Sequence, residues 1–446
     1  MKRLIILICI FSLGCNILSH RGFTTLQWNE KGLDASNSVT PGIPAYNGVV
    51  VDYLRQDKHI LKVKLYDPVV VSVASKPEKW GYFQFPTIYR SVDNTLVATW
   101  NMAADAVESY GHGGRGYAVS KDGGKSWTPT EGDIPIGGGL ILPDGDRIKI
   151  FTPSALKVDS LHLPSPISKE VGRRKFTFYR INQLPASLQG VYIQRLPKGE
   201  TKWISEHATL NDSMAVRYSE SGLFPVVWWG DMQVAPDRSI ITGIYPGFKM
   251  GDYNEVTPSG VFFYRSTDDG HTWNVQGRIP YTPDLSVDSN GNKRINLGYT
   301  EPAFIILSNG IFLCVMRTTD GFGNSPMYLS YSKDEGVSWS VPKPFTSNGV
   351  LPRLLQLGNG VIVLSSGRPG VQLRFSLDGK GDEWTDPFEM LPYKEGEGAV
   401  SCGYTGLLAT GKNSFLIIYS DFEYQNKKGA IRKAIKVREV EVTPNQ

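Results

Sequence analysis

The acidic side chains that recur at a fixed spacing are the first candidates for chemistry in this chain. The string SKDGGKSW begins at residue 120, and related strings begin at residues 266 (STDDGHTW), 332 (SKDEGVSW) and 376 (SLDGKGDEW). Asp and Gly in this order form a tight turn, the Ser and Asp side chains can bond backbone groups of that turn, and the Trp packs beneath it. We therefore interpret each copy as a device that closes a β-hairpin, not as a catalytic group.

Cysteine and histidine do not indicate a metal site. The chain has four Cys and six His, and no Cys-x-x-Cys pair or Cys/His cluster has the spacing of metal ligands. We therefore expect no metal and no cofactor. Cys314 and Cys402 lie in the apolar run IFLCVMR and in SCGY. Two buried free thiols are the simpler interpretation, and a disulfide between them is the alternative.

The elements that carry the repeated turns must be strands. Short apolar or alternating runs such as NTLVATW, GVFFYRS and GVIVLSS alternate with turn residues, and no stretch of helical length has a 3.6-residue apolar period. The repeat starts are separated by 146, 66 and 44 residues. The two shorter spacings each suit one four-stranded blade, and the longest suits at least two blades with a degenerate repeat between them. The sequence predicts an all-β fold, a six-bladed β-propeller over residues 46–446.

The amino terminus predicts export. MKRLIILICIFSLGC combines two basic residues, an apolar core of about ten residues that is too short to span a bilayer, and Gly14-Cys15. We interpret residues 1–15 as a bacterial lipoprotein-type signal with Cys15 as the lipid anchor, and residues 16–45 as a tether. Plain secretion is the alternative. The expected location is the periplasm, the outer membrane or the cell surface, with membrane contact only through this anchor.

The charge of the chain argues against one class of partner. The formal net charge is +4 over 446 residues, and no Lys/Arg run accompanies it. Nucleic-acid-binding proteins carry a basic patch or stripe. We therefore expect no nucleic-acid partner.

With these repeated strings in a predicted six-bladed propeller, the chain resembles the sialidase (neuraminidase) family. The six-bladed propellers of that family carry several such Asp boxes, or BNR repeats. Sialidases hydrolyse a sugar whose anomeric carbon bears a carboxylate. Arginines clamp that carboxylate through bidentate hydrogen bonds, and a carboxylic acid protonates the leaving oxygen. A Tyr, neutral at rest, is the nucleophile, and an adjacent carboxylate is its base.

The resemblance implies roles for residues in the second half of the chain. GYTEPAFIILSNGIFLCVMRTT resembles the stretch in which a Glu opens one strand and an Arg closes the next, which implies Glu301 as the base and Arg317 as a clamp arginine. VIVLSSGRPGVQLRFS resembles the segment with the third clamp arginine, where Arg368 fits better than Arg374. SCGYTGLLATGKNSFLIIYSD resembles the last-blade segment that carries the nucleophile, which implies Tyr404.

The first predicted blade departs from the family pattern. The run FQFPTIYRS has Gln84 in the place of the first clamp arginine, where an amide can donate hydrogen bonds but brings no charge. For the general acid, Asp105 has the usual residue type and Glu108 the better spacing to the box, so both stay candidates. His112, in the glycine-rich run YGHGGRGY, either lines the pocket, serves as an acid or base, or is incidental.

Each assignment also has a structural alternative. Glu301, Arg317 and Arg368 could be ordinary strand-end residues, and the Tyr404 hydroxyl could simply be satisfied within the core. Two further aromatic residues in VVWWGD, Trp228 and Trp229, either stack on a sugar ring or belong to the core.

The leading expectation is an enzyme: an exported exo-glycosidase of the sialidase type, with an acidic glycan or glycoconjugate as substrate. It would release a terminal sialic acid or a related 2-keto sugar acid by a retaining Tyr/Glu mechanism. One alternative is a polysaccharide lyase or uronate-directed enzyme, in which His112 and a Tyr act as acid and base. The other is a non-catalytic glycan-binding propeller.

The signal sequence generates a test of the anchor. Replacing Cys15 with Ser removes the thiol that would carry the lipid, so we expect Cys15→Ser to lose membrane association and to be processed differently. Fractionation and mass spectrometry of the mature amino terminus measure both. Unchanged membrane association and processing would contradict the lipoprotein interpretation.

Overall fold

The computed structural model describes residues 24–29, 49–55, 58–170, 175–226, 229–250, 255–319, 325–368, 370–392 and 399–445. These ranges contain strands, turns and short 3₁₀ segments but no α-helix, so the prediction of an all-β protein is confirmed. No helix in the described part of the chain is long and apolar enough to cross a membrane. The predicted signal, residues 1–15, lies outside these ranges. The 3₁₀ segments are Val107–Ser109, Val158–Ser160, Ile181–Gln183, Ala186–Leu188 and Gly291–Lys293.

Three sheets are four-stranded antiparallel meanders, in which neighbouring strands follow chain order. The first consists of β5 (Tyr82–Arg90), β6 (Leu96–Met102), β7 (Arg115–Ser120) and β8 (Thr128–Thr130). The second consists of β22 (Tyr299–Ile306), β23 (Phe312–Thr318), β24 (Met327–Ser332) and β25 (Lys343–Thr346). The third consists of β26 (Val350–Gln356), β27 (Ile362–Gly367), β28 (Val371–Ser376) and β29 (Phe388–Leu391).

An eight-stranded sheet consists of two four-stranded units joined at their edges. The units meet through the parallel pair β15–β21, while the other neighbours are antiparallel. One unit is β9 (Leu140–Ile141), β10 (Arg147–Ile150), β14 (Val191–Leu196) and β15 (Ile204–Asn211). The other is β18 (Trp229–Val234), β19 (Ile240–Met250), β20 (Val256–Ser266) and β21 (Thr272–Ile279).

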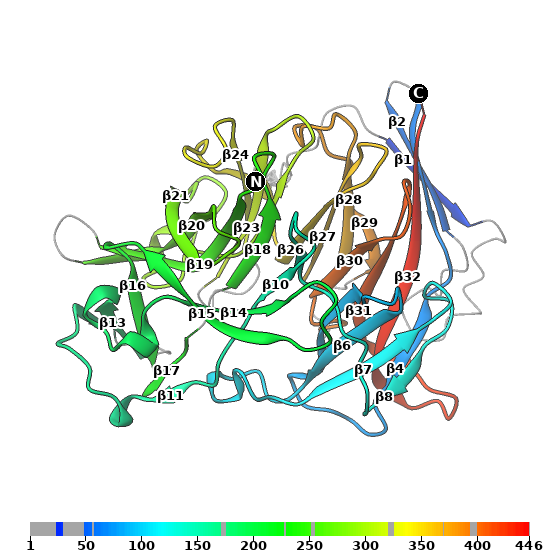
Figure 1. Cartoon of the computed structure of the whole chain (residues 1–446). Helices are drawn as coiled ribbons and strands as arrows, with labels where there is room; N and C mark the ends of the chain where they lie inside the picture. Colours follow the sequence, from blue (N-terminus) through cyan, green and yellow to red (C-terminus); the bar gives the residue numbers. More distant parts are fainter. Residues whose placement is uncertain are drawn as a thin grey trace, which may run out of the picture.

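A seven-stranded sheet ties the early and late parts of the chain together. Its order is β1-β2-β3-β32-β31-β30, and β4 pairs with β32 beside this path. Figure 1 shows β1 and β2 beside β32 at one end of the molecule. Six residues of the predicted tether are therefore a strand. The bounds are β1 (Thr24–Asn29), β2 (Val49–Arg55), β3 (Lys58–Leu65), β4 (Val69–Val73), β30 (Thr405–Ala409), β31 (Ser414–Gln425) and β32 (Ile431–Pro444).

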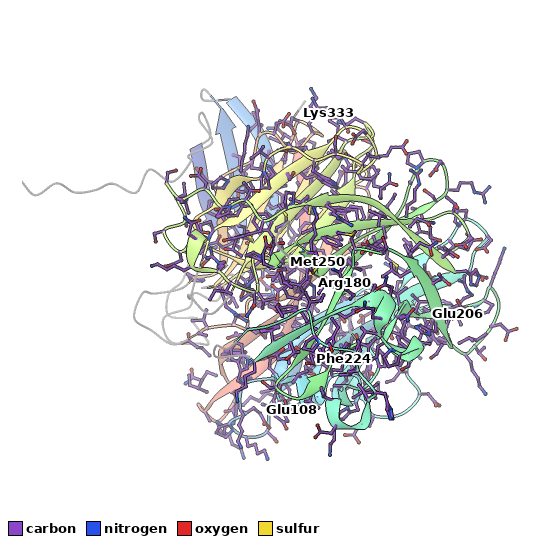
Figure 2. All side chains as sticks on the ribbon, turned by 90° about the vertical axis from the view of Figure 1, so that its left-hand side faces the viewer. Glu108, Arg180, Glu206, Phe224, Met250 and Lys333 are labelled. Carbon is purple, nitrogen blue, oxygen red and sulfur yellow. The ribbon has the colours of Figure 1, made fainter. Side chains whose placement is uncertain are left out.

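An inserted five-stranded sheet is formed by two segments of the chain, one between β10 and β14 and one between β15 and β18, where the sequence did not predict a separate element. It consists of β11 (Leu156–Lys157), β17 (Leu223–Phe224), β16 (Val216–Glu220), β13 (Phe176–Arg180) and β12 (Ser168–Glu170). Figure 2 shows its labelled residues Arg180 and Phe224. The long spacing between the first two boxes therefore contains this sheet as well as four-stranded units. Repeat spacing counts residues and cannot distinguish a repeated unit from an insertion.

Apolar side chains fill the space between consecutive sheets. Leu313 and Val315 of β23 cluster with Leu364 of β27, and Phe375 of β28 clusters with Tyr419 of β31. The strands β5, β22 and β26 come first along the chain in their four-stranded sheets, and β30 comes first in the run β30–β32. These first strands also contact one another: β22 contacts β26, β26 contacts β30, and β30 contacts β5. First strands that adjoin one another while each sheet extends outward give a propeller-like arrangement. These first strands position the site described below.

The four boxes form the hairpin turns that the sequence predicts. In the first box, Ser120 Oγ donates to Asp122 Oδ1 at 2.8 Å, Gly124 N donates to Ser120 Oγ at 2.8 Å and Trp127 Nε1 donates to the Gly124 carbonyl at 3.1 Å. The other three boxes repeat the Ser-to-Asp hydrogen bond at 2.7 Å. The hairpin between β14 and β15 has Lys198 in the place of the Asp and keeps a Trp at the end.

The box tryptophans make the fold sensitive to truncation. Trp384 is fully buried between the sheets that carry β24 and β28. We expect Trp384→Ala to lower the free energy of unfolding by about 3–5 kcal/mol, because the change removes apolar contacts and leaves a cavity. Urea denaturation measures this. Val341→Ala is the control, since Val341 is 72% exposed and should change stability by less than about 0.5 kcal/mol. Equal effects of the two changes would contradict the packing role.

Candidate active site

The candidate base Glu301 lies in a bulge at the start of β22. The pairing register with β23 shifts between Thr300 and Ala303, and Glu301 has a φ of 47°. A bulge re-aims a side chain relative to the regular alternation of its strand. A non-glycine residue in this region of φ costs on the order of 1–3 kcal/mol and occurs where surrounding structure imposes it. The strained backbone thus coincides with the residue that the sequence selected as the base.

Three groups donate hydrogen bonds to the Glu301 carboxylate. The Tyr404 hydroxyl donates to Oε1, and Arg317 Nη1 donates to the same oxygen at 3.0 Å. The backbone N–H of Leu351 donates to Oε2 at 2.9 Å. Leu351 also has a positive φ, 38°, within a register shift of β26. Residues from three sheets therefore converge on one carboxylate, and the three residues predicted as base, clamp arginine and nucleophile are in direct contact.

The charges in this cluster set the protonation of each group. Burial would raise the pKa of Glu301, but Arg317, the Tyr404 hydroxyl and the Leu351 N–H together hold it below its usual value. Burial first, and then the charge of Glu301, raise the pKa of Tyr404 well above its usual value. Glu301 is therefore ionised and Tyr404 is a neutral phenol at neutral pH. Such a pair can pass the phenol proton to the carboxylate as the Tyr oxygen bonds to an electrophile.

Arg368 lies beside the Tyr404 ring. Its Nε donates to the Cys402 carbonyl at 3.1 Å, and its guanidinium carbon is 5.7 Å from the centre of the Tyr404 ring. Two glycines permit this approach, because a Cβ on Gly367 would lie 2.1 Å from the Cα of Gly403. The residues that follow them in the chain, Arg368 and Tyr404, are thereby brought together.

The less favoured arginine, Arg374, lies elsewhere. It is on β28, where its guanidinium carbon is 5.8 Å from the centre of the Phe345 ring. Burial is the main cause that lowers its pKa to about 10, against the opposing charge of Asp386. The structure therefore selects Arg368 over Arg374 as the arginine beside Tyr404.

Gln84 does not present its side chain as the sequence suggested. It lies on β5, but it is completely buried, and its Oε1 accepts a hydrogen bond from the Gly81 N–H at 3.0 Å. A side chain without exposed surface cannot touch a ligand in this conformation. In this conformation the amide secures the turn that precedes β5, and the expected substrate contact of Gln84 stays a prediction.

Of the acid candidates, Asp105 is connected to the cluster and Glu108 is not. Asp105 Oδ2 accepts a hydrogen bond from Trp80 Nε1 at 2.9 Å, and the Trp80 ring centre is 5.2 Å from the Arg368 guanidinium carbon. The side chains of Glu108 and His112 are exposed, and no described side-chain contact links either to Tyr404. Sequence spacing favoured Glu108, but the connection through Trp80 favours Asp105.

The fold brings to the site residues that their local sequence does not mark. Tyr245 on β19 is partly buried near Glu301 and Tyr404, and burial, followed by the electrostatic effect of these two groups, raises its pKa well above the usual value. Phe85 packs against Tyr404 with ring centres 4.8 Å apart. Nothing in their local sequence distinguishes these aromatic residues from core residues. Trp228 lies outside the described residues, and Trp229 is the first residue of β18.

An ion pair adjoins the cluster on neighbouring strands. Arg353 lies on β26, two residues after Leu351. Its Nη1 is 3.0 Å from Asp231 Oδ1 of β18. Burial raises the pKa of Asp231, and the charge of Arg353 opposes that rise. The sequence analysis singled out neither residue. Such a pair can be found only when the strands that carry it are placed side by side.

Metal ligation and disulfide formation have no support in the described residues. These residues contain no group of three or more His, Cys, Asp or Glu side chains that could hold a metal ion. Cys314 and Cys402 are both buried free thiols, which agrees with the simpler sequence interpretation. The Cys402 Sγ accepts hydrogen bonds from Ser420 Oγ and from the Phe85 N–H, so this residue supports the backbone beside Tyr404.

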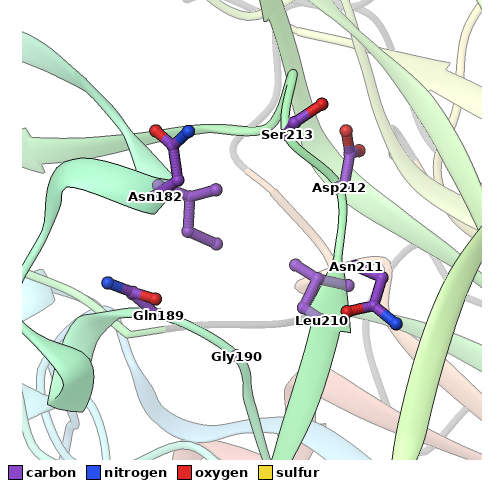
Figure 3. Close-up of a pocket in the computed structure, with 8 residues that line it drawn as sticks. Asn182, Gln189, Gly190, Leu210, Asn211, Asp212 and Ser213 are labelled. Atoms are coloured by element: carbon purple, nitrogen blue, oxygen red, sulfur yellow. The ribbon is translucent and has the colours of Figure 1, made fainter.

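A cavity of about 440 Å³ lies apart from these residues, between β15 and the 3₁₀ segments of the insertion (Figure 3). None of the residues around Tyr404 lines it. Its buried acidic residue, Asp212, accepts hydrogen bonds from Tyr264 at 2.8 Å and from the Met214 N–H at 2.9 Å. The cavity is therefore separate from the candidate catalytic residues around Tyr404. The lining residues are Ile181, Asn182, Gln189, Gly190, Leu210, Asn211, Asp212 and Ser213.

No protein-family model and no curated protein matches the sequence. Among solved structures, the chain is similar to a protein of unknown function from Dyadobacter fermentans, with 17% identity and a TM-score of 0.59 over 85% of this chain and 99% of that one. This likeness shows a shared fold.

Two similar structures are named as glycoside hydrolases. An α-L-arabinanase of Penicillium chrysogenum has 17% identity and a TM-score of 0.48 over 84% of this chain and 98% of that one. The NanB sialidase of Streptococcus pneumoniae has 13% identity and a TM-score of 0.45 over 84% of this chain and 70% of that one. At these scores a function has to be argued from the site itself.

The lowered pKa of Glu301 generates a prediction about stability. A carboxyl with a depressed pKa in the folded state stabilises the fold above its unfolded pKa of about 4.3, and this contribution disappears as pH falls through the folded pKa. We expect Glu301→Gln to destabilise the protein most near neutral pH, with a smaller difference from wild type in acid.

Urea unfolding from about pH 7 to about pH 3 measures this difference. The exposed Glu389 supplies the control change, Glu389→Gln, which should show little difference at any pH. A Glu301→Gln difference that stays constant across the range would contradict the ionised, paired Glu301.

Proposed function

We propose that this protein is an exported, retaining exo-glycosidase of the sialidase type, which releases a terminal sialic acid or a related 2-keto sugar acid from glycans. The observation that carries the proposal is the hydrogen bond from Tyr404 to Glu301, with Arg317 on the same carboxylate oxygen. A phenol beside an ionised, buried carboxylate can be deprotonated as it attacks. A neutral nucleophile also suits a substrate whose own carboxylate would repel an anionic one.

In the first step, the Tyr404 oxygen bonds to the anomeric carbon and its proton passes to Glu301. The bond from the anomeric carbon to the leaving oxygen breaks, and the electron pair of that bond remains on the oxygen. Asp105 supplies a proton to this oxygen, so the leaving group departs as a neutral alcohol.

In the second step, water attacks the anomeric carbon of the covalent intermediate. Asp105, now a carboxylate, accepts one proton of the water, and the Tyr404 oxygen leaves with its electron pair and recovers the proton held by Glu301. Two inversions at one carbon give net retention. The product is the free sugar acid.

The clamp for the sugar carboxylate would consist of two arginines. Arg317 has five N–H donors, of which Nη1 serves Glu301, and Arg368 is oriented through its Nε by the Cys402 carbonyl. Guanidinium groups fit carboxylates through paired hydrogen bonds. The buried Gln84 adds no third cation. The two arginines support an acidic sugar as substrate. Without a third cation, the clamp is weaker than that of the family pattern.

We further propose six blades for the architecture. Five are the four-stranded units β5–β8, β9/β10/β14/β15, β18–β21, β22–β25 and β26–β29, and the sixth is β30–β32 with β4. The inserted sheet of five strands would lie outside the count. Export through the signal at residues 1–15 belongs to the same proposal.

The two alternatives make different predictions. A lyase would use His112 and a Tyr, whereas the His112 side chain is exposed and Tyr404 is engaged with Glu301. A lyase would give an unsaturated, ultraviolet-absorbing product, which hydrolysis cannot give. A non-catalytic propeller would bind glycans saturably without turnover, although the contacts around Glu301 are those of a complete nucleophile and base.

The proposed nucleophile is tested by Tyr404→Phe. Loss of the hydroxyl removes the atom that bonds to the anomeric carbon, so we expect turnover to fall by at least about 10³-fold while ligand binding persists. A panel of 2-keto sugar acid glycosides and uronate oligosaccharides supplies the substrates. Full activity in Tyr404→Phe would rule out the mechanism.

Tyr192→Phe is the matched control. Its hydroxyl donates to the Ser187 carbonyl, and the residue is on β14 beside the insertion, so its loss should leave turnover within about threefold of wild type.

A further inference from the structure

Trp80 is a large aromatic side chain beside the residues that flank Tyr404, and the proposed mechanism does not use it. It is 42% exposed, and its Nε1 donates to Asp105 Oδ2 at 2.9 Å. The indole N–H is the only hydrogen-bond donor of a Trp side chain, and here it is directed to a carboxylate. An exposed carboxylate such as Asp105 has few other restraints on its position. Trp80 therefore holds one conformation of Asp105.

The Trp80 ring is itself fixed from several sides. Its centre is 5.2 Å from the guanidinium carbon of Arg368, 6.4 Å from the Phe85 ring centre and 6.2 Å from that of Phe422. The two aromatic contacts are edge to face, an arrangement that favours particular ring orientations. Phe85 and Arg368 both adjoin Tyr404. Trp80 thus connects the candidate acid to the two residues that flank the candidate nucleophile.

The backbone next to Trp80 is secured to the segment that carries Asp105. Asn101 Nδ2 lies 2.8 Å from both the Gly81 and the Ala103 carbonyl oxygens, and Gln84 Oε1 accepts from the Gly81 N–H. Gly81 has a φ of 98°, and a Cβ on it would lie 2.7 Å from the Asp105 nitrogen. Only glycine allows this approach. The Gln84 amide, at the position where the resemblance implies a clamp arginine, therefore supports the turn that carries Trp80.

We propose that Trp80 is a positioning residue, which holds Asp105 as the general acid at a fixed place relative to Tyr404. This inference rests on the proposed function and decides between the two acid candidates. Asp105 gives its proton to the leaving oxygen as the bond to the anomeric carbon breaks, and the leaving group departs as an alcohol. Trp80 keeps its own N–H throughout and touches no reacting atom.

The dependence of rate on the leaving group tests this role. A general acid matters when the leaving oxygen is basic, as in a sugar or alkyl glycoside, and matters little for a 4-nitrophenyl glycoside, whose oxygen leaves without a proton. Trp80→Phe keeps an aromatic ring and removes the N–H. Asp105 also assists the second step, which both substrates share, so the comparison uses kcat/KM, which reports the first step. We expect kcat/KM on alkyl glycosides of the sugar acid to fall about 10- to 100-fold, and kcat/KM on the nitrophenyl glycoside to change by less than about threefold. Asp105→Asn should show the same selectivity with a larger loss.

Two control variants separate positioning from a loss of stability. Asp133→Asn removes an exposed carboxylate from the loop after β8, and Trp203→Phe alters a tryptophan on the hairpin after β14. Both should leave the ratio of the two kcat/KM values unchanged. Thermal unfolding of every variant shows that the compared proteins are folded at the assay temperature.

The outcomes separate this inference from the function on which it rests. Wild-type turnover that disappears in Tyr404→Phe supports the glycosidase. If Trp80→Phe then slows both substrates equally, or if Glu108→Gln and not Asp105→Asn shows the selective loss, the positioning role is wrong and the glycosidase stands. If wild type turns over no glycoside of the panel, the proposed function and the inference both fail.

Discussion

The described arrangement depends on one buried carboxylate, that of Glu301. Burial alone would favour its neutral form, and an unpaired buried charge is unfavourable. Arg317, Tyr404 and the Leu351 N–H supply three hydrogen bonds from two neighbouring sheets and from Glu301's own hairpin. The carboxylate therefore stays ionised only if these segments keep their relative positions. The rigidity of the fold and the protonation of the site are two consequences of the same contacts.

Positive φ values at non-glycine residues occur in two settings, beside the Glu301 cluster and in turns that include two of the box hairpins. Positive φ values at non-glycine residues occur in or beside the register shifts of β5, β22 and β26, at Phe83, Phe85, Glu301 and Leu351. These are the chain-order-first strands of three sheets and lie next to the cluster. The box hairpins share a Ser-to-Asp hydrogen bond after the third strand of a sheet. Two of them also contain a non-glycine residue with positive φ, Asp269 and Glu335.

The first sheet departs most from the pattern that the sequence resembles, and its departures belong together. Gln84 is buried, and its amide binds the turn that bears Trp80. Trp80 in turn contacts Asp105 and Arg368. Gln84, Trp80, Asp105 and Arg368 are thus connected through contacts in and beside this sheet.

The sequence by itself determined the local features. The Ser-Asp-Gly-Trp spacing defined the hairpin turns and the all-β class, because those side chains bond within the turn that they define. The ordered series of Glu301, Arg317, Arg368 and Tyr404 could be selected because the segments that carry these residues resemble those of the sialidase family. The inserted sheet was missed, since residue spacing does not reveal what the intervening residues form.

Only the tertiary structure decided which side chains meet. Glu301 and Tyr404 are separated by 103 residues, and the bulge that turns Glu301 toward Tyr404 has no marker in the local sequence. Tyr245, Asp231 and Arg353 resemble ordinary strand residues until β18, β19 and β26 are placed around β22. The preference for Asp105 over Glu108 as candidate acid depends on the direction of the Trp80 N–H. The burial of Gln84 depends on the turn at Gly81, whose N–H donates to its side chain. Such contacts join separate sheets, and the packing of those sheets is a property of the whole fold.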